Sequence, residues 1–476
     1  MKDLLLLSGS ALAAKIRRRE VSSAEVVEAH IRHVERVNPA LNAMVHTRFD
    51  EARAEAREAD RALAEGRADL GPFHGVPCSI KEAFAVRGMP NTSGLVARKG
   101  RLAERDAVTV ARLRRAGSIV LGVTNVSELC MWMESNNRVY GRSNNPYDQS
   151  RTCGGSSGGE GAIVGAGAAP YGLGSDIGGS IRMPAFFNGV FGHKPTGGLV
   201  PNTGQYPSAT PGLEEYVCTG PITRRAEDMY PLLRVLLGGE ERAERLQDPA
   251  SVDVGSLTVF FMEEDGRHTV DPELIRAQER AAAVLAARGA RVKKATLPDF
   301  KHALEIWGTM VGEAGGPSFA ELLGDGTPVP AGRELARWML GRSPHTLPAI
   351  ALALVEGLQK RVGEKHASRF REKGRRLQAE IQDLLGPNGV LLYPPHPLPA
   401  PRHVQPLLKP FRWVYTAIFN VLKLPVTAVP MGLSREGLPL GVQVASVPWN
   451  DHVTLAVARE LERELGGWSP PRKWLS

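Results

Sequence analysis

The chain has 476 residues, of which 42% are hydrophobic and 6% aromatic, and its formal net charge is +8. This positive charge raises the hypothesis of a nucleic-acid-binding protein, but the basic clusters at 17–19 and 373–376 lie on helical patterns without interleaved aromatic residues. We therefore expect no nucleic-acid partner. Four cysteines in a chain of this length exclude a disulfide-rich scaffold and favour a reducing compartment, so we expect a cytoplasmic protein.

The N-terminal part is predicted to be helical. MKDLLLL is too short for a signal-peptide core, and residues 11–20 continue it as an amphipathic helix. Ser22 or Ser23 with Glu25 forms a capping-box pattern before a second helix, and a charged, alanine-rich helix is expected over 50–65.

A strand is predicted where the chain reads GVPCSIKEAF, residues 75–84. Residues 76–80 are apolar enough for a short buried strand, and a lysine at its end would point into the protein. Desolvation lowers the pKa of a buried ammonium, which makes Lys81 a candidate neutral base. Glu82 would face the other side of the strand, because adjacent side chains alternate.

Two serine clusters among glycines follow, GGSSGG at 154–159 and DIGGSIR at 176–182. Glycine is favoured where main-chain N–H groups must approach a ligand closely, so the two glycines before Ser180 indicate an oxyanion hole and make Ser180 the candidate nucleophile. Ser157 is expected to hydrogen-bond within its loop. Asp176 and Arg182 flank the nucleophile and are expected to brace its turn as an ion pair.

A rival interpretation places the nucleophile at Ser156, because residues 154–158 satisfy the G-x-S-x-G pattern of the α/β-hydrolase elbow. That elbow requires a strand directly before the serine. Residues 144–153 are instead a polar turn sequence.

Glycine, cysteine and histidine spacing elsewhere argues against cofactors. Residues 165–170 break the G-x-G-x-x-G pattern, and no glycine loop ends in Gly-Lys-Ser/Thr. C-x-x-C and H-E-x-x-H spacings are absent from the sequence. We expect neither a metal nor a cofactor.

Short apolar runs alternate with helical patterns over the rest of the chain, as in a sheet covered by helices on both faces. The predicted strands are 118–123, 257–261, 390–393, 425–429 and 440–445. The longest apolar run, 347–355, contains Pro348 and is followed by Glu356, so no membrane-spanning helix is predicted. Residues 333–361 pair apolar turns with Arg and Lys, which leaves peripheral membrane contact open beside a plain solvent-facing helix.

GVPCSIKE, GGSSGG and GSDIGGSIRMPA, in this order, resemble the amidase signature family of serine hydrolases. The resemblance implies a triad of Lys81, Ser156 as bridging serine and Ser180 as nucleophile. It also implies that the backbone N–H groups of residues 177–180 (Ile177, Gly178, Gly179 and Ser180) hold the oxyanion. The implied fold is one α/β domain over 1–476, with a mixed sheet of about eleven strands covered by helices on both faces. Its signature core spans about 70–205, and a variable helical insert at about 301–385 is expected to form a lid.

Within the family, the stretches at 180–198, 389–397 and 437–452 look most like the fatty-acid amide hydrolases, particularly their type 2 branch. A lipophilic acyl amide is therefore the expected substrate. Cys130, Met131 and Trp132 align with a segment that lines the acyl pocket there, although an apolar Met/Trp cluster is also common in an ordinary core.

Other activities remain open on the same fold. The amidase subunit of a tRNA-dependent amidotransferase acts on glutamine, but Met183 stands where those subunits usually carry glutamine, and Phe186 and Phe187 make the surroundings apolar. An aryl acylamidase is a further alternative. The expected partners are a small-molecule amide and, for assembly, a second copy of the chain.

Overall fold

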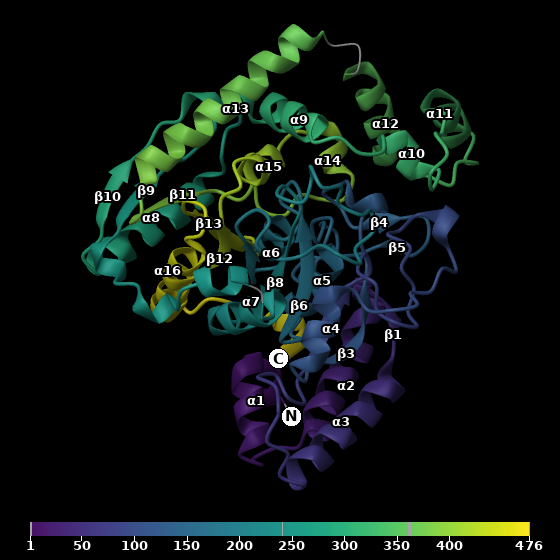
Figure 1. Cartoon of the computed structure of the whole chain (residues 1–476), viewed down its shortest axis with the longest axis vertical. Helices are drawn as coiled ribbons and strands as arrows, with labels where there is room; N and C mark the ends of the chain where they lie inside the picture. Colours follow the sequence, from purple (N-terminus) through teal and green to yellow (C-terminus); the bar gives the residue numbers. More distant parts are fainter. Residues whose placement is uncertain (1, 240, 360–362, 476) are drawn as a thin grey trace.

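The computed structural model describes residues 2–239, 241–359 and 363–475. Over these residues the centre of the molecule is an eleven-stranded sheet, in the order β1-β3-β2-β6-β8-β7-β12-β13-β11-β9-β10, and β4 and β5 form a separate pair (Figure 1). The strands are β1 (Met44–Thr47), β2 (Pro77–Lys81), β3 (Ile119–Thr124), β4 (Asn136–Asn137), β5 (Gly141–Arg142), β6 (Tyr171–Asp176), β7 (Phe191–Lys194), β8 (Cys218–Thr223), β9 (Thr258–Phe261), β10 (Arg291–Lys294), β11 (Gly389–Tyr393), β12 (Val426–Leu433) and β13 (Pro439–Ala445).

The sheet is mixed. β2 runs parallel to both β3 and β6, and β9 runs parallel to both β10 and β11. The strands between them, from β6 to β13, are antiparallel, as is the β1 edge. This arrangement agrees with the predicted mixed sheet of about eleven strands.

Helices surround the sheet. They are α1 (Gly9–Arg17), α2 (Ser23–Leu41), α3 (Phe49–Ala64), α4 (Val108–Arg115), α5 (Gly158–Gly165), α6 (Arg182–Phe187), α7 (Met229–Leu237), α8 (Pro272–Ala287), α9 (Ala303–Glu313), α10 (Phe319–Leu323), α11 (Ala331–Met339), α12 (Leu347–Gln359), α13 (Glu364–Leu385), α14 (Gln405–Leu408), α15 (Val414–Val421), α16 (Asp451–Leu465) and α17 (Arg472–Leu475). α1 to α3 form a group at the bottom of Figure 1, and α9 to α13 run along the top.

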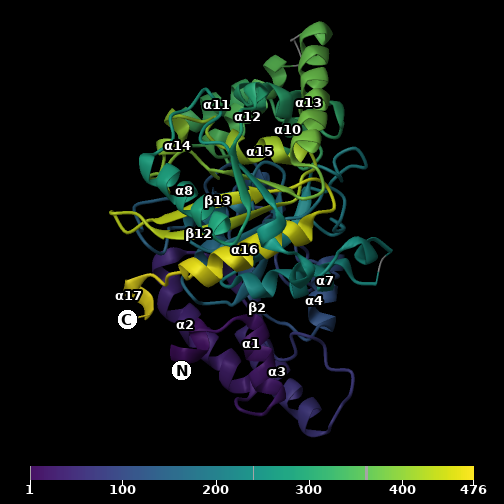
Figure 2. The same cartoon turned by 90° about the vertical axis from the view of Figure 1, so that its left-hand side faces the viewer.

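Buried side chains form two main clusters against the sheet. The larger contains apolar residues of α7, α8 and α16, and Figure 2 shows α16 and α8 in front of β12 and β13. The second joins α2, α3 and α5 with residues such as Leu121 on β3 and Ala428 on β12. A small cluster outside both packs α10 and α12 against Leu129. Burial on both faces agrees with the central strands β6, β8, β7 and β13, in which every residue is buried.

The predicted strands and helices are present close to their expected bounds. The capping box of α2 belongs to Ser22, whose side chain accepts from the Glu25 N–H while the Glu25 carboxylate accepts from the Ser22 N–H. The sequence did not reveal β6 and β8, because YGLGSD and CTGPIT contain glycine or proline, which are depleted in strands. Among the described residues, no helix is long and apolar enough to cross a membrane.

Candidate functional site

Lys81 ends β2, a strand that is buried along its whole length. Its Nζ lies 2.7 Å from Ser156 Oγ and 2.9 Å from Ser175 Oγ. A neutral lysine amine has two N–H donors and one lone pair, so it can donate to Ser175 and still accept a proton from Ser156. The predicted inward orientation of Lys81 is therefore correct.

Burial is the largest influence on the charge of Lys81 and lowers the pKa of its ammonium below the ordinary lysine value. Contacts with Cys130, Asp176 and Glu160 oppose this shift. The lowered pKa favours the neutral amine that general-base chemistry requires.

Glu82 does not share the environment of Lys81, as strand alternation predicted. Its carboxylate accepts hydrogen bonds from the N–H and hydroxyl of Thr92, from the Ser93 N–H and from the Tyr140 hydroxyl, at 2.6–2.8 Å. Burial raises the pKa of Glu82 to about 7 despite these donors. Among the described residues, Glu82 forms no direct bond to Lys81, so it does not oppose the lowering of the lysine pKa in this way.

Ser156 and Ser157 occupy the turn before α5 and are fully buried. The Gly155–Ser156 peptide bond is cis. A side chain at Gly155 would collide with the carbonyl oxygen of Trp132, so this turn requires glycine. No strand directly precedes Ser156 among the described residues, which contradicts the nucleophile-elbow interpretation.

Ser180 lies in the connection from β6 to α6 and is 8% exposed. The Ser157 N–H donates to the Ser180 carbonyl oxygen at 3.2 Å, which holds the two serine loops side by side. Ser157 also bonds through its hydroxyl to the Ser175 carbonyl oxygen at 3.3 Å. In the described chain, the Ser180 hydroxyl forms no hydrogen bond to Ser156.

Asp176 and Arg182 form a fully buried ion pair beneath the Ser180 turn, with Nη2 and Oδ1 2.9 Å apart. Arg182 also donates to the Thr416 carbonyl oxygen, Gln443 Oε1 and Asn420 Oδ1. Burial tends to raise the pKa of the Asp176 carboxyl, but Arg182 and backbone N–H donors outweigh it and hold this pKa well below its ordinary value. The Ser180 turn therefore rests on an ionised and fully paired support.

Three of the four predicted oxyanion donors are free. Within the described residues, the N–H groups of Ile177, Gly178 and Ser180 have no hydrogen-bond acceptor. Gly179 differs, because its N–H already donates to Asp176 Oδ1 at 2.7 Å. Gly179 has a φ of 113°, and a side chain there would collide with Thr416. The engaged N–H and the positive φ argue against the expected place of Gly179 among the donors.

The segment predicted to line a pocket lies next to Lys81 and Gly155. Cys130 acts electrostatically on Lys81, and the carbonyl of Trp132 abuts Gly155. Cys130 is buried, whereas Met131 and Trp132 are partly exposed. The buried indole N–H of Trp132 has no partner among the described residues.

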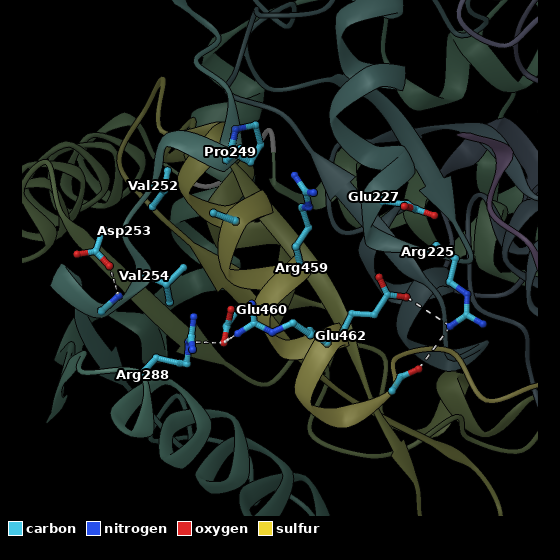
Figure 3. Close-up of a pocket in the computed structure, with 15 residues that line it drawn as sticks. Arg225, Glu227, Pro249, Val252, Asp253, Val254, Arg288, Arg459, Glu460 and Glu462 are labelled. Carbon is cyan, nitrogen blue, oxygen red and sulfur yellow. Dashed lines mark hydrogen bonds and ion pairs between the residues drawn. The ribbon is translucent and has the colours of Figure 1, made fainter. Parts of the chain in front are cut away.

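A surface cavity of about 690 Å³ lies elsewhere, lined by α16 and by the segments that precede α8 (Figure 3). Two ion pairs lie in its lining, since Arg288 bonds Glu460 at 2.8 Å and Arg225 lies 3.5 Å from Glu462. Its lining contains no predicted site residue, and it is not the candidate site. Among the described residues, no group of three His, Cys, Asp or Glu side chains could hold a metal ion.

The sequence analysis missed Ser175, Trp307 and Thr416, which all contact the catalytic loops. Trp307 Nε1 donates to the Ile177 carbonyl oxygen at 2.8 Å, and Thr416 Oγ1 donates to the Gly178 carbonyl oxygen at 2.8 Å. Ser175 had a usable signal, because it stands directly before the glycine-rich nucleophile turn. Trp307 and Thr416 had none.

Comparisons with known proteins place the chain in a family. A family model described as Amidase matches residues 25–455. Fatty-acid amide hydrolase 2-A of Danio rerio is 49% identical over 488 residues, covering 99% of this chain and 91% of the relative. Fatty-acid amide hydrolase 2 of Homo sapiens is 47% identical over 490 residues, covering 99% and 92%. The solved structure of 6-aminohexanoate cyclic dimer hydrolase complexed with substrate is 27% identical, with a TM-score of 0.81 over 99% of this chain and 100% of that one.

Proposed function

Because this chain belongs to the amidase signature family, and is thus a hydrolase that acts on amide C–N bonds, we propose that it cleaves fatty acyl amides through an acyl-enzyme on Ser180. The observation that carries the mechanism is the buried separation of 2.7 Å between Lys81 Nζ and Ser156 Oγ. A hydroxyl is a weak nucleophile at its free pKa, so it needs a base of this kind.

The proposed proton path runs from Ser180 to Ser156 to Lys81. Neutral Lys81 accepts the Ser156 proton, Ser156 accepts the Ser180 proton, and Ser180 Oγ forms a bond to the amide carbonyl carbon. Transfer between the serines requires their hydroxyls to reach hydrogen-bond distance in the substrate complex, where catalytic contacts often tighten. Ser175 keeps the lysine amine in place during these transfers.

The tetrahedral intermediate carries a negative oxygen, which we assign to the free N–H groups of Ile177, Gly178 and Ser180. One such donor is typically worth about 3 kcal/mol of barrier. Collapse breaks the C–N bond, and the proton held on Lys81 returns through Ser156 to the leaving amine. Water then attacks the acyl-enzyme, which releases the carboxylic acid and regenerates Ser180.

Apolar surroundings support the assignment of a lipophilic acyl group. Met183, Phe186 and Phe187 are buried immediately after the nucleophile. Phe186 and Phe187 pack with ring centroids 5.2 Å apart. The names of the two fatty-acid amide hydrolases that resemble the chain over nearly its full length point to the same substrate class.

The triad is tested with Ser180→Ala, Ser156→Ala and Lys81→Ala, each assayed on a long-chain fatty amide, a short aryl amide and glutamine. We expect all three variants to lose activity and the wild type to prefer the long-chain amide. Activity retained by Ser180→Ala would show that the nucleophile is misassigned. Turnover of glutamine alone would favour the amidotransferase subunit, and a preference for the aryl amide would favour an aryl acylamidase.

We propose further that the helical insert at about 301–385 acts as a lid over the acyl site. Two contacts support this assignment. His345 Nδ1 lies 2.8 Å from Glu128 Oε1, two residues before Cys130, and Leu129 packs against α10 and α12. The insert is therefore joined to the segment that is expected to line the pocket.

Peripheral membrane contact is proposed for the α11 region of this insert. Met339 and Leu340 are each 69% exposed, and Arg337 and Arg342 flank them in the sequence. Apolar side chains beside cations suit a lipid surface. Co-sedimentation with phosphatidylcholine vesicles, with and without anionic lipid, tests this contact. We expect the wild type to pellet and a Met339→Glu, Leu340→Glu double variant to stay in solution; wild type that never pellets would contradict the proposal.

A cytoplasmic location and a homodimer complete the proposal. The four cysteines are free thiols and are buried, which suits a reducing compartment. Cell fractionation tests the location, and light scattering on the purified enzyme tests the assembly. A secreted enzyme would refute the cytoplasmic location, and a monomer at all concentrations would refute the homodimer.

A further inference from the structure

The peptide plane that joins Ile177 to Gly178 is held from its carbonyl side by a residue of the helical insert. Trp307 Nε1 on α9 donates to the Ile177 carbonyl oxygen at 2.8 Å, from 130 residues further along the chain. A trans peptide is planar, and its C=O and N–H point in opposite directions. Holding the carbonyl therefore fixes the direction of the Gly178 N–H, one of the free donors of the loop.

The next peptide plane is held in the same way from a different helix. Thr416 Oγ1 on α15 donates to the Gly178 carbonyl oxygen at 2.8 Å, and the Gly179 N–H on the other side of this plane donates to Asp176. The carbonyl oxygen and the N–H of this second plane therefore both have hydrogen-bond partners. In the plane held by Trp307, the carbonyl oxygen accepts a hydrogen bond, whereas the N–H has no acceptor among the described residues. This is the arrangement expected of an oxyanion donor.

Packing determines where the indole of Trp307 lies. Its ring meets the ring of Trp413 edge to face, with centroids 4.7 Å apart and planes at 82°. Trp413 in turn contacts the loop, since a side chain at Gly178 would lie 3.2 Å from its ring. The Trp307 ring is partly buried, and α9 packs against α13 and α15. The donor is therefore positioned before substrate binds.

We propose that Trp307 is a positioning residue of the oxyanion hole, whose indole N–H holds the Ile177–Gly178 peptide with the Gly178 N–H facing the reacting carbonyl. This inference rests on the proposed function, because it takes Ser180 as the nucleophile. It makes α9, the first helix of the insert, part of the catalytic geometry in addition to its place in the lid.

The inference is tested with Trp307→Phe and Trp307→Leu. Both replacements remove the N–H donor but differ in volume. We expect each to lower kcat by a similar factor, about 3- to 10-fold, with KM nearly unchanged, because one neutral hydrogen bond is lost and only the transition state uses the oxyanion donors. A loss in KM that grows from Phe to Leu would instead identify Trp307 as a wall of the pocket and overturn the proposal.

A second readout isolates the oxyanion. A long-chain trifluoromethyl ketone accepts Ser180 Oγ at its carbonyl carbon, and the carbonyl oxygen becomes an oxyanion, whereas the corresponding secondary alcohol cannot. We expect Trp307→Phe to weaken binding of the ketone by the same factor by which it lowers kcat, and to leave binding of the alcohol unchanged. Equal weakening of both compounds, or of neither, would refute the positioning role.

Trp413→Phe is the matched control, since the Trp413 ring touches the same loop but its indole donates to no atom of that loop in the described structure. We expect it to reduce kcat by a smaller factor than Trp307→Phe. Thermal unfolding of each variant establishes that it is folded. Ser180→Ala separates the proposed function from the positioning role of Trp307. If Ser180→Ala remains active, the proposed nucleophile is wrong. If the wild type is active and Trp307→Phe is unaffected, only the positioning role is contradicted.

Discussion

Two fully buried titratable groups near the proposed nucleophile both favour their deprotonated forms, which leaves an anion at Asp176 and favours an uncharged amine at Lys81. Asp176 has a guanidinium and several N–H donors, so it stays ionised in the interior. Lys81 has two serine hydroxyls, which do not repay the cost of burying an ammonium, and its pKa falls. The same buried site therefore keeps a fixed anion at Asp176 and favours the neutral amine that the proposed proton transfer requires.

The first prediction is an acid-side loss of activity. Below its lowered pKa, Lys81 is protonated and cannot accept a proton, so kcat/KM should fall as pH decreases through that pKa, which lies below the ordinary lysine value of about 10.4. We expect one such decrease, the acid limb, when kcat/KM is measured from about pH 5 to 10. A flat profile, with chemistry shown to limit the rate, would contradict Lys81 as the base.

Glu160 supplies the control for that profile. Its carboxyl accepts from Ser79 and Thr124 hydroxyls at 2.6 and 2.7 Å, and burial raises its pKa to about 7, so it could produce a similar limb. Glu160→Gln removes this titration. We expect the limb to persist in that variant, and its disappearance would transfer the titration to Glu160.

At the scale of elements, the proposed catalytic residues are concentrated at the ends of neighbouring parallel strands. Lys81 ends β2, and the Ser180 turn follows β6, which pairs with β2 in parallel. Equivalent ends of parallel strands lie at one edge of a sheet, so Lys81 and the Ser180 turn, the proposed base and nucleophile, lie at the same edge. α5 begins just after Ser156 and brings the bridging serine to the same edge.

Gly179→Ala should disable this connection. The residue has a φ of 113°, where an L side chain is strained, and its Cβ would collide with Thr416. We expect kcat to fall by about 100-fold or more, because the neighbouring N–H donors would be displaced. Gly332→Ala on α11, where a side chain meets open space, is the matched control and should keep wild-type kcat. An equally active Gly179→Ala variant would argue against a rigid turn.

At the scale of the whole molecule, a buried carboxylate fastens the N-terminal helix to the sheet. Asp228, just before α7, accepts from the Gly9 and Ser10 N–H groups and from the Ser10 hydroxyl at 2.7–2.8 Å. These N–H groups begin α1 and have no partner within the helix, so the carboxylate satisfies them and complements the helix dipole.

Asp228→Ala should therefore lower stability without affecting chemistry. We expect a loss of about 2–4 kcal/mol in the free energy of unfolding, because hydrogen bonds to a charged acceptor are removed and their donors are left buried. Denaturant unfolding measures this loss, and kcat should stay unchanged because Asp228 lies outside the catalytic loops. Asp228→Asn keeps one acceptor oxygen and should lose less. A fall in kcat at full stability would disagree with this structural role.

Short-range patterns account for most of what the sequence alone determined. The buried run ended by Lys81, the glycines around Ser156 and Ser180, and the Ser22 capping box each depend on residues a few positions apart, so local geometry and burial sufficed to predict them. The family resemblance added the mixed sheet of about eleven strands, which agrees with the structure. The roles of the triad residues stay predictions.

Only the tertiary structure decided how the nucleophile turn is supported. Trp307 lies 130 residues after its hydrogen-bond partner in the turn, and Thr416 lies 238 residues after its own. Pairings over such separations produce no periodicity or spacing that can be read in the sequence. The same holds for Gly179. The glycine motif predicts that its N–H binds the oxyanion, but in the folded turn this N–H donates to Asp176 instead. Hydrogen-bond partners in a buried turn depend on which distant elements pack around it, and that packing exists only in the folded chain.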